Sequence, residues 1–303
     1  MGPALPRIDT AARGRLTARF GSAAEAWLDA APDLLTTLAE RWRLELGFAI
    51  PRGSVSLVLR CQTDTGVAAV LKASPDRARM AGEAAALRGW HGVHTPAVLA
   101  HDEGLGALLI EAIEPGTPLD LSSTQPAAAL VAELLRALHE GAAGDGGYPP
   151  LERRIAALYD SSVKLYERHP ELVTLIPPAL YERGRSRALR LAGDAGACVL
   201  IHGDLTPANI LDGGPERGLV AIDPAPCLGD PAFDTVDLLL WRADDRPAIA
   251  TRAAGLAAAT GLDAERLLGW CAAFAAMTAL ERASQPAGSA AGIDALLELA
   301  AGV

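Results

Sequence analysis

The chain has few cysteines, and their spacing excludes a metal or disulfide framework. Only Cys61, Cys198, Cys227 and Cys271 occur among 303 residues, far apart and without paired metal-ligand spacing. Two of them lie in apolar runs, which is typical of small buried hydrophobic residues in a reducing compartment. We therefore expect buried free thiols and neither zinc nor structural disulfides.

Long hydrophobic runs are also lacking. Residues 1–15 contain no continuous apolar core of signal-peptide length, and no later segment reaches the uncharged length needed to span a bilayer. We therefore expect a cytoplasmic protein without a membrane partner.

Basic residues are outnumbered by acidic ones, 27 against 37, which gives a net charge of −10. Because binding to a phosphate backbone needs clustered Lys and Arg, this balance argues against a nucleic-acid partner. An acidic protein would suit a cationic small molecule. Charge alone nevertheless favours the simpler interpretation that acidity keeps the protein soluble, so the positions of the acids must decide.

A Walker-type Gly-Lys-Ser element is absent from the sequence, which disfavours a P-loop enzyme. Half of the residues are hydrophobic and 21% are charged, as in globular proteins, and frequent Ala favours helix over sheet. The length is sufficient for two lobes that share one cleft.

The most informative stretch is His-Gly-Asp-Leu-Thr-Pro-Ala-Asn at 202–209, followed by Ala-Ile-Asp-Pro at 221–224. Phosphoryl transfer needs a carboxylate that receives the proton of the attacking hydroxyl and oxygen ligands that hold Mg²⁺ on the nucleotide phosphates. Kinases space these groups as Asp, four residues, Asn, then a second Asp. This spacing predicts an ATP-dependent small-molecule kinase with Asp204 as the catalytic base and with Asn209 and Asp223 as Mg²⁺ ligands.

The local context supports a site at these residues. The apolar runs 198–201 and 219–222 predict short buried strands that lead to the two candidate acids. Turn residues at 212–215 predict a hairpin that returns Asn209 toward Asp223. The alternative that the acids belong to ordinary turns is disfavoured, because order, spacing and strand context rarely coincide.

Elsewhere the chain predicts a small mixed lobe followed by helices. Residues 23–43 predict two helical stretches broken at Pro32. The elements expected after them are strands at 54–60 and 67–72, a helix at 76–90, strands at 97–100 and 107–110, and then helices near 125–139, 151–168, 179–191, 232–241, 246–259, 264–282 and up to 301.

Lys72 and Glu83 match a second kinase feature. Lys72 ends an apolar strand and Glu83 lies on the helix that follows; in kinases such a lysine holds the nucleotide phosphates and such a glutamate holds the lysine. A lysine at a strand end is usually a solvated charge, and Glu is common on helix surfaces. The distance between the two residues favours the functional interpretation, more strongly for Lys72.

Two further nucleotide contacts are expected. The segment 47–54 would cover the phosphates, but it has only two glycines, so backbone amides or Ser54 would do the binding. The segment 111–116 suits an interlobe hinge whose backbone at Glu111 and Ile113 would pair with adenine. A plain loop is an equally good interpretation of this segment.

Several motifs resemble those of one known family. They are Ala-Trp-Leu at 26–28, Arg-Trp at 41–42, Ser-Leu-Val at 56–58, Ala-Val-Leu-Lys at 69–72, Gly-Trp-His-Gly at 89–92, His-Asp at 101–102, Ala-Ile-Asp-Pro-Ala-Pro at 221–226 and Gly-Asp-Pro-Ala-Phe-Asp at 229–234. The family is the aminoglycoside phosphotransferases, in particular the streptomycin 6-phosphotransferase and hydroxyurea-resistance kinase group.

The resemblance implies an α+β, bilobal, protein-kinase-like fold. A small antiparallel-sheet lobe at 1–113 would bind the nucleotide, and a mainly helical lobe at 114–303 would carry the catalytic loop and acceptor site. The family uses ATP and Mg²⁺ to phosphorylate a hydroxyl of an aminocyclitol or amino sugar. We expect a monomer. Protein kinases fit less well, because Gly203 replaces the arginine of their catalytic triplet and no Ala-Pro-Glu segment follows Asp223.

The acceptor site is less well defined. Thr206, Pro207 and the helix at 272–282 depart from the family pattern, and the acceptor pocket is therefore expected to differ.

Asp230, Asp234 and Asp237 follow the metal-binding turn and would pair with the ammonium or guanidinium groups of an acceptor. The alternative is structural, with Asp230 bound to backbone amides and the other two capping the helix at 238–241. His139 is expected to pack or hydrogen-bond within its helix.

Three functions are compatible with these features. The leading hypothesis is an O-phosphotransferase acting on a streptomycin-like aminoglycoside. The alternatives are a kinase of an amino sugar, another sugar or hydroxyurea, and a nucleotide-binding pseudokinase. The last is disfavoured, because a non-catalytic descendant has no chemical need for Asp204, Asn209, Asp223 and Lys72 together.

Overall fold

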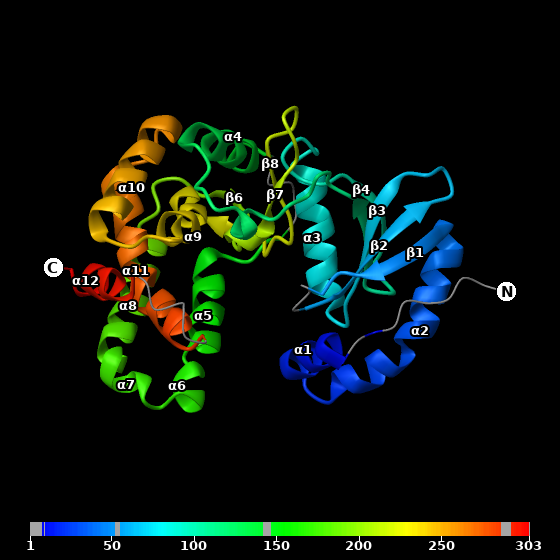
Figure 1. Ribbon diagram of the computed structural model, residues 1–303, viewed down its shortest axis with the longest axis horizontal. Helices are drawn as coiled ribbons and strands as arrows, with labels where there is room; N and C mark the ends of the chain where they lie inside the picture. Colours follow the sequence, from blue (N-terminus) through cyan, green and yellow to red (C-terminus); the bar gives the residue numbers. More distant parts are fainter. Residues whose placement is uncertain (1–7, 9, 52–54, 142–146, 286–291, 303) are drawn as a thin grey trace. The chain divides into compact units, whose positions relative to one another are not determined.

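The computed structural model describes residues 8, 10–51, 55–141, 147–285 and 292–302. The chain divides into two compact units, Met1–Gly116 and Thr117–Val303 (Figure 1).

The first unit contains a five-stranded antiparallel sheet with the order β1-β2-β3-β5-β4. Helices α1 and α2 precede the sheet, and α3 connects β3 to β4. The bounds are α1 Thr10–Phe20, α2 Ala23–Trp42, β1 Leu44–Ala49, β2 Leu57–Thr63, β3 Ala68–Ala73, α3 Arg77–Gly89, β4 Val98–Asp102 and β5 Ala107–Glu111.

Helices α1 and α2 cover one face of this sheet. Leu57, Leu59 and Cys61 alternate along β2, so their side chains share one face. They belong to one buried cluster with Leu16 of α1 and Leu35 of α2. The hydrophobic period of two in the strand thus matches the apolar stripe of the helices.

Helix α2 runs unbroken through Pro32, so the prediction of two stretches broken at this residue is wrong. A proline inside a helix costs ~3 kcal/mol, because it removes a hydrogen bond and crowds the preceding turn. The fully buried Leu28, Ala31 and Leu38 on both sides of Pro32 hold the helix against the sheet. Their burial offsets this cost, since each large aliphatic side chain contributes ~2 kcal/mol.

Strand β1 occupies positions 44–49, where no strand was expected. Its last three residues belong to the segment predicted to cover the nucleotide phosphates, and the Ile50 amide extends the pairing by donating to Val58 O at 2.8 Å. The connection to β2 therefore begins later than the sequence suggested. Ser54, the predicted phosphate contact, lies outside the described residues.

The second unit is mainly helical, and two short strand pairs flank the 202–209 and 221–224 motifs. Its helices are α4 Ala128–His139, α5 Leu151–Ser162, α6 Leu165–Arg168, α7 Leu172–Leu175, α8 Pro178–Gly193, α9 Val236–Leu240, α10 Arg246–Thr260, α11 Ala264–Ala283 and α12 Ile293–Ala301, with 3-10 turns η1 Leu119–Leu121, η2 Pro207–Asn209 and η3 Pro231–Thr235. Its strands are β6 Val199–Ile201, β7 Ile210–Asp212, β8 Leu219–Ala221 and β9 Cys227–Gly229.

Helix α11 forms the core of the second unit and packs against α8, α10 and α12. Its Trp270 and Phe274 both make edge-on ring contacts with Phe233 of η3, and their own rings are tilted against each other. Such aromatic pairs add ~1 kcal/mol each beyond their area burial. The segment that follows the 221–224 turn is thereby held on the helical core.

Both strand pairs are antiparallel. In the first, β6 pairs with β9, and in the second, β7 pairs with β8 as a hairpin in which Ile210 faces Ala221. The fold class predicted from the sequence is confirmed: an antiparallel sheet in one unit and a mainly helical second unit.

The thiols differ from the expectation at one position. Cys61, Cys227 and Cys271 are buried, but Cys198 is exposed because it precedes β6 rather than lying within the strand. Burial raises the pKa of Cys61 to about 11 and that of Cys227 to about 12, so neither is a reactive thiolate. Among the described residues, no helix has the length and apolar character needed to cross a membrane.

Candidate active site

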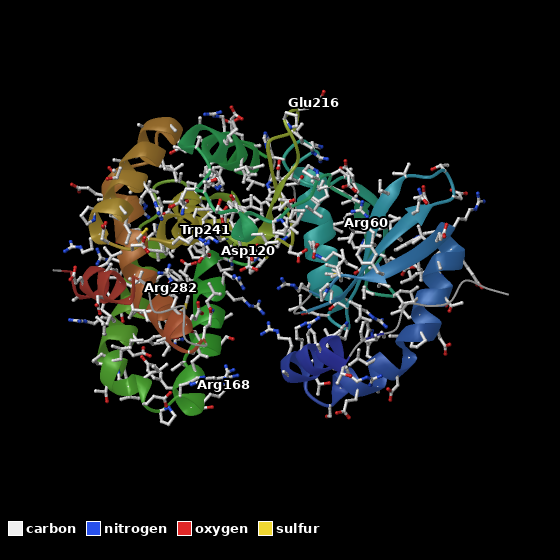
Figure 2. The ribbon with its side chains drawn as sticks, viewed as in Figure 1. Arg60, Asp120, Arg168, Glu216, Trp241 and Arg282 are labelled. Carbon is white, nitrogen blue, oxygen red and sulfur yellow. The ribbon has the colours of Figure 1, made fainter. Side chains whose placement is uncertain are left out.

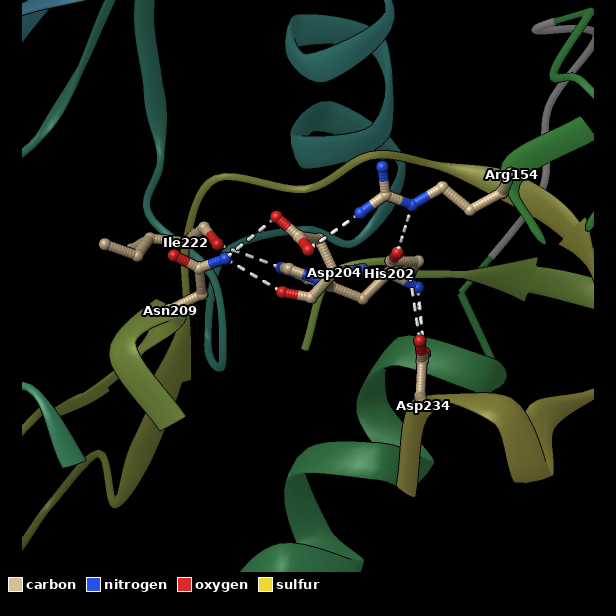
Figure 3. A network of polar contacts seen from close by, with 7 residues as sticks. Arg154, His202, Asp204, Asn209, Ile222 and Asp234 are labelled. Atoms are coloured by element: carbon tan, nitrogen blue, oxygen red, sulfur yellow. Dashed lines mark hydrogen bonds and ion pairs between the residues drawn. The ribbon is translucent and has the colours of Figure 1, made fainter. Parts of the chain in front are cut away.

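The 202–209 loop begins where β6 ends, and the buried carboxylate of Asp234 fixes its start (Figure 3). The amides of His202 and Gly203 donate to Asp234 at 2.8 and 2.9 Å, and His139 Nε2 lies 3.1 Å from the same carboxylate. Burial raises the pKa of Asp234, but the hydrogen bond and charge of His139 and the amide donors outweigh it and lower the pKa. Asp234 is thus an ionised anchor for the loop, with no lone pair directed at solvent.

The His202 ring connects the loop to the segment before Asp223. Its Nε2 lies 3.0 Å from Ile222 O and donates to it, and its Nδ1 accepts from the Asp204 amide at 3.3 Å (Figure 3). One donor and one acceptor are the pattern of a neutral imidazole. Burial lowers the pKa of His202, and the nearby Asp234 and Asp204 carboxylates only partly oppose this, so the ring is uncharged at neutral pH.

Gly203 occupies a position that admits no side chain. Its φ is +73°, and a Cβ there would lie 2.2 Å from Ala225 O and 3.3 Å from Cys227 Sγ. Glycine adopts this conformation freely, whereas other residues would be both strained and in collision. The local backbone therefore forces a His-Gly-Asp triplet where protein kinases carry an arginine.

Asp204 is the accessible acid of the loop, with 30% of its side chain exposed. Its Oδ1 accepts from Arg154 Nη2 at 2.7 Å, while Arg154 Nε donates to Gly203 O at 2.8 Å. Its Oδ2 accepts a longer hydrogen bond from Asn209 Nδ2 at 3.2 Å. One carboxylate oxygen is therefore held by a cation, and the other keeps a lone pair for an incoming hydroxyl.

The β7–β8 hairpin brings the two predicted metal ligands to one end of the strand pair. The Ile222 amide donates to Asn209 O at 2.9 Å, and Asp223 follows directly. Asp223 has a φ of +58°, in the left-handed region that Asp tolerates better than most residues. Such a conformation costs ~1–3 kcal/mol and is found most often at functional sites.

The donor atoms of Asn209 and Asp223 fit Mg²⁺. Asn209 Nδ2 donates to Asp204 O at 2.8 Å, which orients the amide so that Oδ1 points away from Asp204. An oxygen from Asn and a carboxylate from Asp form a hard donor set, and Mg²⁺ bound with nucleotide needs only one or two protein ligands. The described residues contain no cluster of three or more His, Cys, Asp or Glu arranged to hold a metal by themselves.

In the first unit, Lys72 of β3 and Glu83 of α3 form a buried ion pair. Lys72 is 2% exposed and Glu83 1%, and Lys72 Nζ donates to Glu83 Oε1. Taking two charges out of water is costly, so a pair this deep is weak evidence for stability and is better explained by a role in a site. The structure thus brings together the two residues that the sequence analysis paired.

Lys72 allows a sharply controlled prediction, because the chain has only two lysines and the other, Lys164, is exposed. Lys72→Met should weaken ATP affinity and turnover together, each by ~10-fold or more, since a phosphate contact would be lost. Lys164→Met should change neither. Isothermal titration with ATP measures the affinity of both variants, and steady-state kinetics measures their turnover. If Lys72→Met kept wild-type affinity and turnover, as Lys164→Met should, Lys72 would have a structural role alone.

The predicted adenine contacts lie at the end of β5. The Glu111 amide donates to Ala97 O at 2.9 Å, its carboxylate accepts from the Ala97 amide at 3.1 Å, and Ile113 is buried. Glu114 forms an ion pair with Arg60 of β2, which is labelled in Figure 2. The segment is therefore tied to the sheet, and its contact with adenine stays a prediction.

Asp230 is buried, 3% exposed, and all its contacts are internal. Its Oδ1 accepts from the Ala232 amide at 2.9 Å, and its Oδ2 accepts from Arg266 Nε and Trp270 Nε1, both at 2.6 Å. The structural alternative considered for Asp230 thus describes its surroundings. For Asp234 the capping alternative is wrong, because its carboxylate binds the 202–209 loop and not the first amides of α9.

Asp237 of α9 is the predicted acceptor acid that remains accessible to solvent, and Glu281 of α11 is a second accessible acid near it. Protein atoms packed around Asp237, followed by repulsion from Asp204 and Glu281, raise its pKa to about 7, while Arg154 opposes the shift. Burial and Asp204 also raise the pKa of Glu281, and Ser162 opposes this. Two further carboxylates, Asp237 and Glu281, thus lie near the candidate base Asp204, and the three repel one another.

The carbonyls that end helix α9 are held by side chains from other elements, and this fixes the helix that carries Asp237. Trp241 O accepts from Gln125 Nε2 at 2.7 Å and from Arg252 Nη1 at 2.6 Å, and Leu240 O accepts from Arg282 Nη2 at 2.5 Å. Trp241 and Arg282 are labelled in Figure 2. Cations at a helix C-terminus also stabilise its dipole.

Sequence reasoning missed Arg154, Glu281 and the role of His139. Arg154 lies 50 residues before Asp204, and no motif marks it. Glu281 lies in the helix at 272–282, which departs from the family pattern, and the acid near it, Asp237, comes from another helix. His139 was expected to act within its own helix, but it contacts Asp234 instead.

A five-stranded antiparallel sheet, a buried Lys–Glu pair and an Asp-x₄-Asn loop followed by the Ile-Asp-Pro turn at 222–224 define a protein-kinase-like phosphotransferase with an alcohol group as acceptor. Solved structures agree with this fold. A choline kinase from Streptococcus pneumoniae has a TM-score of 0.61 at 17% identity, covering 89% of this chain and all of its own. A macrolide 2'-phosphotransferase from Brachybacterium faecium has a TM-score of 0.55 at 21% identity, covering 88% and 96%.

The sequence model of the family described as "Aminoglycoside/hydroxyurea antibiotic resistance kinase" matches residues 41–285, and the chain belongs to this family. Streptomycin 6-kinase from Streptomyces glaucescens is 32% identical, over 83% of this chain and 82% of its own. Hydroxyurea phosphotransferase from Kitasatospora aureofaciens is 31% identical, over 83% and 73%. The resemblance inferred from the motifs is thereby confirmed.

Proposed function

We propose that the protein is an ATP- and Mg²⁺-dependent O-phosphotransferase whose acceptor is a cationic aminocyclitol or aminoglycoside of the streptomycin kind. The observation that carries the proposal is Asp204, an accessible carboxylate in a kinase-family loop with two further accessible acids, Asp237 and Glu281, around it. The relatives named streptomycin 6-kinase support the acceptor class.

In this mechanism Asp204 Oδ2 takes the proton of the acceptor hydroxyl as the oxygen forms its bond to the γ-phosphorus of ATP. The bond to the bridging oxygen breaks and ADP leaves. Asn209 Oδ1 and the Asp223 carboxylate would hold Mg²⁺, which when bound neutralises charge on the phosphates. Lys72, fixed by Glu83, would contribute a further positive charge to the phosphates.

The acceptor specificity follows from charge. Asp237 and Glu281 would pair with ammonium or guanidinium groups, and a neutral sugar would gain nothing there to offset the desolvation of the acids. We extend the proposal to the surroundings of the enzyme: a cytoplasmic monomer without nucleic-acid or membrane partners, as its acidic composition suggests.

A thermal-shift panel tests this proposal. Streptomycin and other guanidinylated or aminated cyclitols should raise the melting temperature in the presence of Mg²⁺ and a non-hydrolysable ATP analogue, because ligands that bind the native state stabilise it. Neutral hexoses should give no shift. A shift with glucose and none with streptomycin would reject the cationic acceptor while leaving the phosphotransfer residues in place.

A second acceptor, hydroxyurea, is favoured by the relative named for it, whose identity to this chain is similar to that of the streptomycin kinases. Hydroxyurea is small and neutral at pH 7. Its turnover should therefore be insensitive to Asp237→Asn and to salt, whereas turnover of a cationic acceptor should depend on both.

The raised pKa of Asp237 predicts a pH dependence for a cationic acceptor. The group is anionic above about pH 7 and neutral below it, so the attraction is present at higher pH and lost as pH falls. KM for streptomycin should rise by ~5-fold from about pH 8 to about pH 6, the scale of a partly exposed ion pair.

Asp237→Asn should remove this pH dependence and give the high KM throughout. Glu216→Gln is the matched control, since Figure 2 shows Glu216 at the tip of the β7–β8 hairpin. An unchanged pH profile of KM in Asp237→Asn would exclude Asp237 from the acceptor site.

A further inference from the structure

Helix α5 delivers Arg154 to the 202–209 loop, and its guanidinium bridges two consecutive residues there (Figure 3). Nε donates to Gly203 O at 2.8 Å and Nη2 donates to Asp204 Oδ1 at 2.7 Å. Only 19% of the Arg154 side chain is exposed. The rigid fork of a guanidinium holds both atoms at once, which a lysine ammonium on its flexible stem would not do as well.

The loop lacks a cation of its own. Residues 202–209 include no Lys or Arg, and His202 is neutral by its hydrogen-bond pattern. Meanwhile burial raises the pKa of Asp237 and of Glu281, and repulsion from the nearby Asp204 carboxylate adds to both shifts. Phosphoryl transfer would bring still more negative charge. A fixed guanidinium beside Asp204 offsets this repulsion where the loop cannot.

The β6–β9 strand pair anchors both elements that carry the Arg154–Asp204 ion pair. The Leu228 amide of β9 donates to Pro149 O at 2.9 Å, and Pro150 forms a parallel bridge with Leu228, just before α5 begins. Leu151 then packs directly on Gly229, where a Cβ would lie 2.5 Å from the Leu151 Cβ. Because β9 also pairs with β6, which leads into the loop, α5 and the 202–209 loop are anchored to the same strand pair.

Gly203 explains why the cation beside Asp204 comes from helix α5 and not from the 202–209 loop itself. A side chain at this position would collide with Ala225, so the loop has no room for the arginine that protein kinases carry in their triplet. The carbonyl of Gly203 instead accepts from Arg154 Nε at 2.8 Å.

We propose that Arg154 is a positioning residue for phosphoryl transfer: it holds Asp204 through Oδ1 so that Oδ2 is presented to the acceptor hydroxyl. The inference rests on the proposed function, in which Asp204 is the base. Arg154 acts through Asp204, and its removal should lower kcat while leaving KM for ATP nearly unchanged. A misplaced base costs ~100-fold in rate when reacting atoms are displaced by about 1 Å.

A double-mutant cycle with streptomycin as acceptor tests this proposal. Arg154→Ala should lower kcat by ~30-fold or more, and Arg154→Lys by ~10-fold, since it keeps the charge without the fork. In the Asp204→Asn background, Arg154→Ala should cause no further loss, because residues that act as a unit are non-additive. The exposed neighbour Arg153 provides the control, and Arg153→Ala should retain wild-type kcat.

Guanidinium chloride at sub-denaturing concentration should partly restore kcat to Arg154→Ala and leave Asp204→Asn unchanged. Additive losses in the double variant, or equal increases in both KM values, would overturn the proposal and give Arg154 a general structural role. If Arg154→Ala fails to fold, the same cycle is run with Arg154→Lys, and additivity there rejects the proposal.

The two failures are distinguishable. Wild-type turnover in Asp204→Asn would reject the proposed function, whereas loss in Asp204→Asn with wild-type turnover in Arg154→Ala would reject only the role of Arg154. If streptomycin is not an acceptor, the cycle is measured on ATP hydrolysis with water as acceptor, where non-additivity supports the proposal and additivity overturns it.

Discussion

Asp204→Asn should lower kcat by at least about 100-fold, the usual contribution of a general base, while Mg²⁺-dependent ATP affinity stays within twofold of wild type. Asn keeps the shape of the side chain and an oxygen that accepts from Arg154 Nη2, so the loop should remain in place. What is lost is the lone pair that receives the acceptor proton. Steady-state kinetics and calorimetric titration with Mg²⁺ and ATP measure the two quantities.

Asp204→Ala makes a useful comparison, because it removes the partner of Arg154 as well as the base. A similar kcat for the two variants would show that proton transfer accounts for the loss. Wild-type turnover in either one would remove Asp204 from the mechanism.

Asp223→Asn should abolish the Mg²⁺-dependent part of ATP binding, because a charged ligand to the ion is removed. The choice of Asn follows from the backbone: at a φ of +58°, Asn is tolerated about as well as Asp, whereas Ala would add strain. We expect a loss of ~30-fold or more in ATP affinity with Mg²⁺. Without Mg²⁺, wild type and variant should bind ATP equally.

Titration calorimetry with and without Mg²⁺ separates these outcomes. The same stimulation of binding by Mg²⁺ in Asp223→Asn and wild type would refute the metal assignment. As a control for folding, the melting temperature of Asp223→Asn without ATP should be close to that of wild type, both with and without Mg²⁺.

The parts of the site that sequence predicted well are those encoded locally. The strand β6, the 202–209 loop and the β7–β8 hairpin follow one another along the chain, and short apolar runs with turn residues between them specify this order. Lys72 and Glu83 were paired correctly for the same reason, since a strand leads directly into the helix that carries the glutamate.

The errors arose where tertiary contacts override local signals. Pro32 suggested a helix break, but burial of the surrounding leucines against the sheet keeps α2 continuous. For Asp230 and Asp234 the sequence left an acceptor contact and a structural role open, because only the folded chain brings Arg266 and the loop amides to them.

The role of Arg154 could not be predicted from the sequence, because it too depends on tertiary contacts. Its partner lies on another element, and the contact depends on how α5 is anchored to β9. The acidic surroundings of Asp204 likewise combine residues of α9 and α11, which no spacing rule connects.

The most direct test of the account is transfer of labelled phosphate from γ-labelled ATP to streptomycin, measured with wild type and Asp204→Asn side by side. We expect labelled streptomycin with wild type in the presence of Mg²⁺, none when Mg²⁺ is chelated, almost none with the variant, and no label on glucose or glucosamine. Label on glucose or glucosamine with none on streptomycin would contradict the acceptor, and transfer by Asp204→Asn at the wild-type rate would contradict the mechanism.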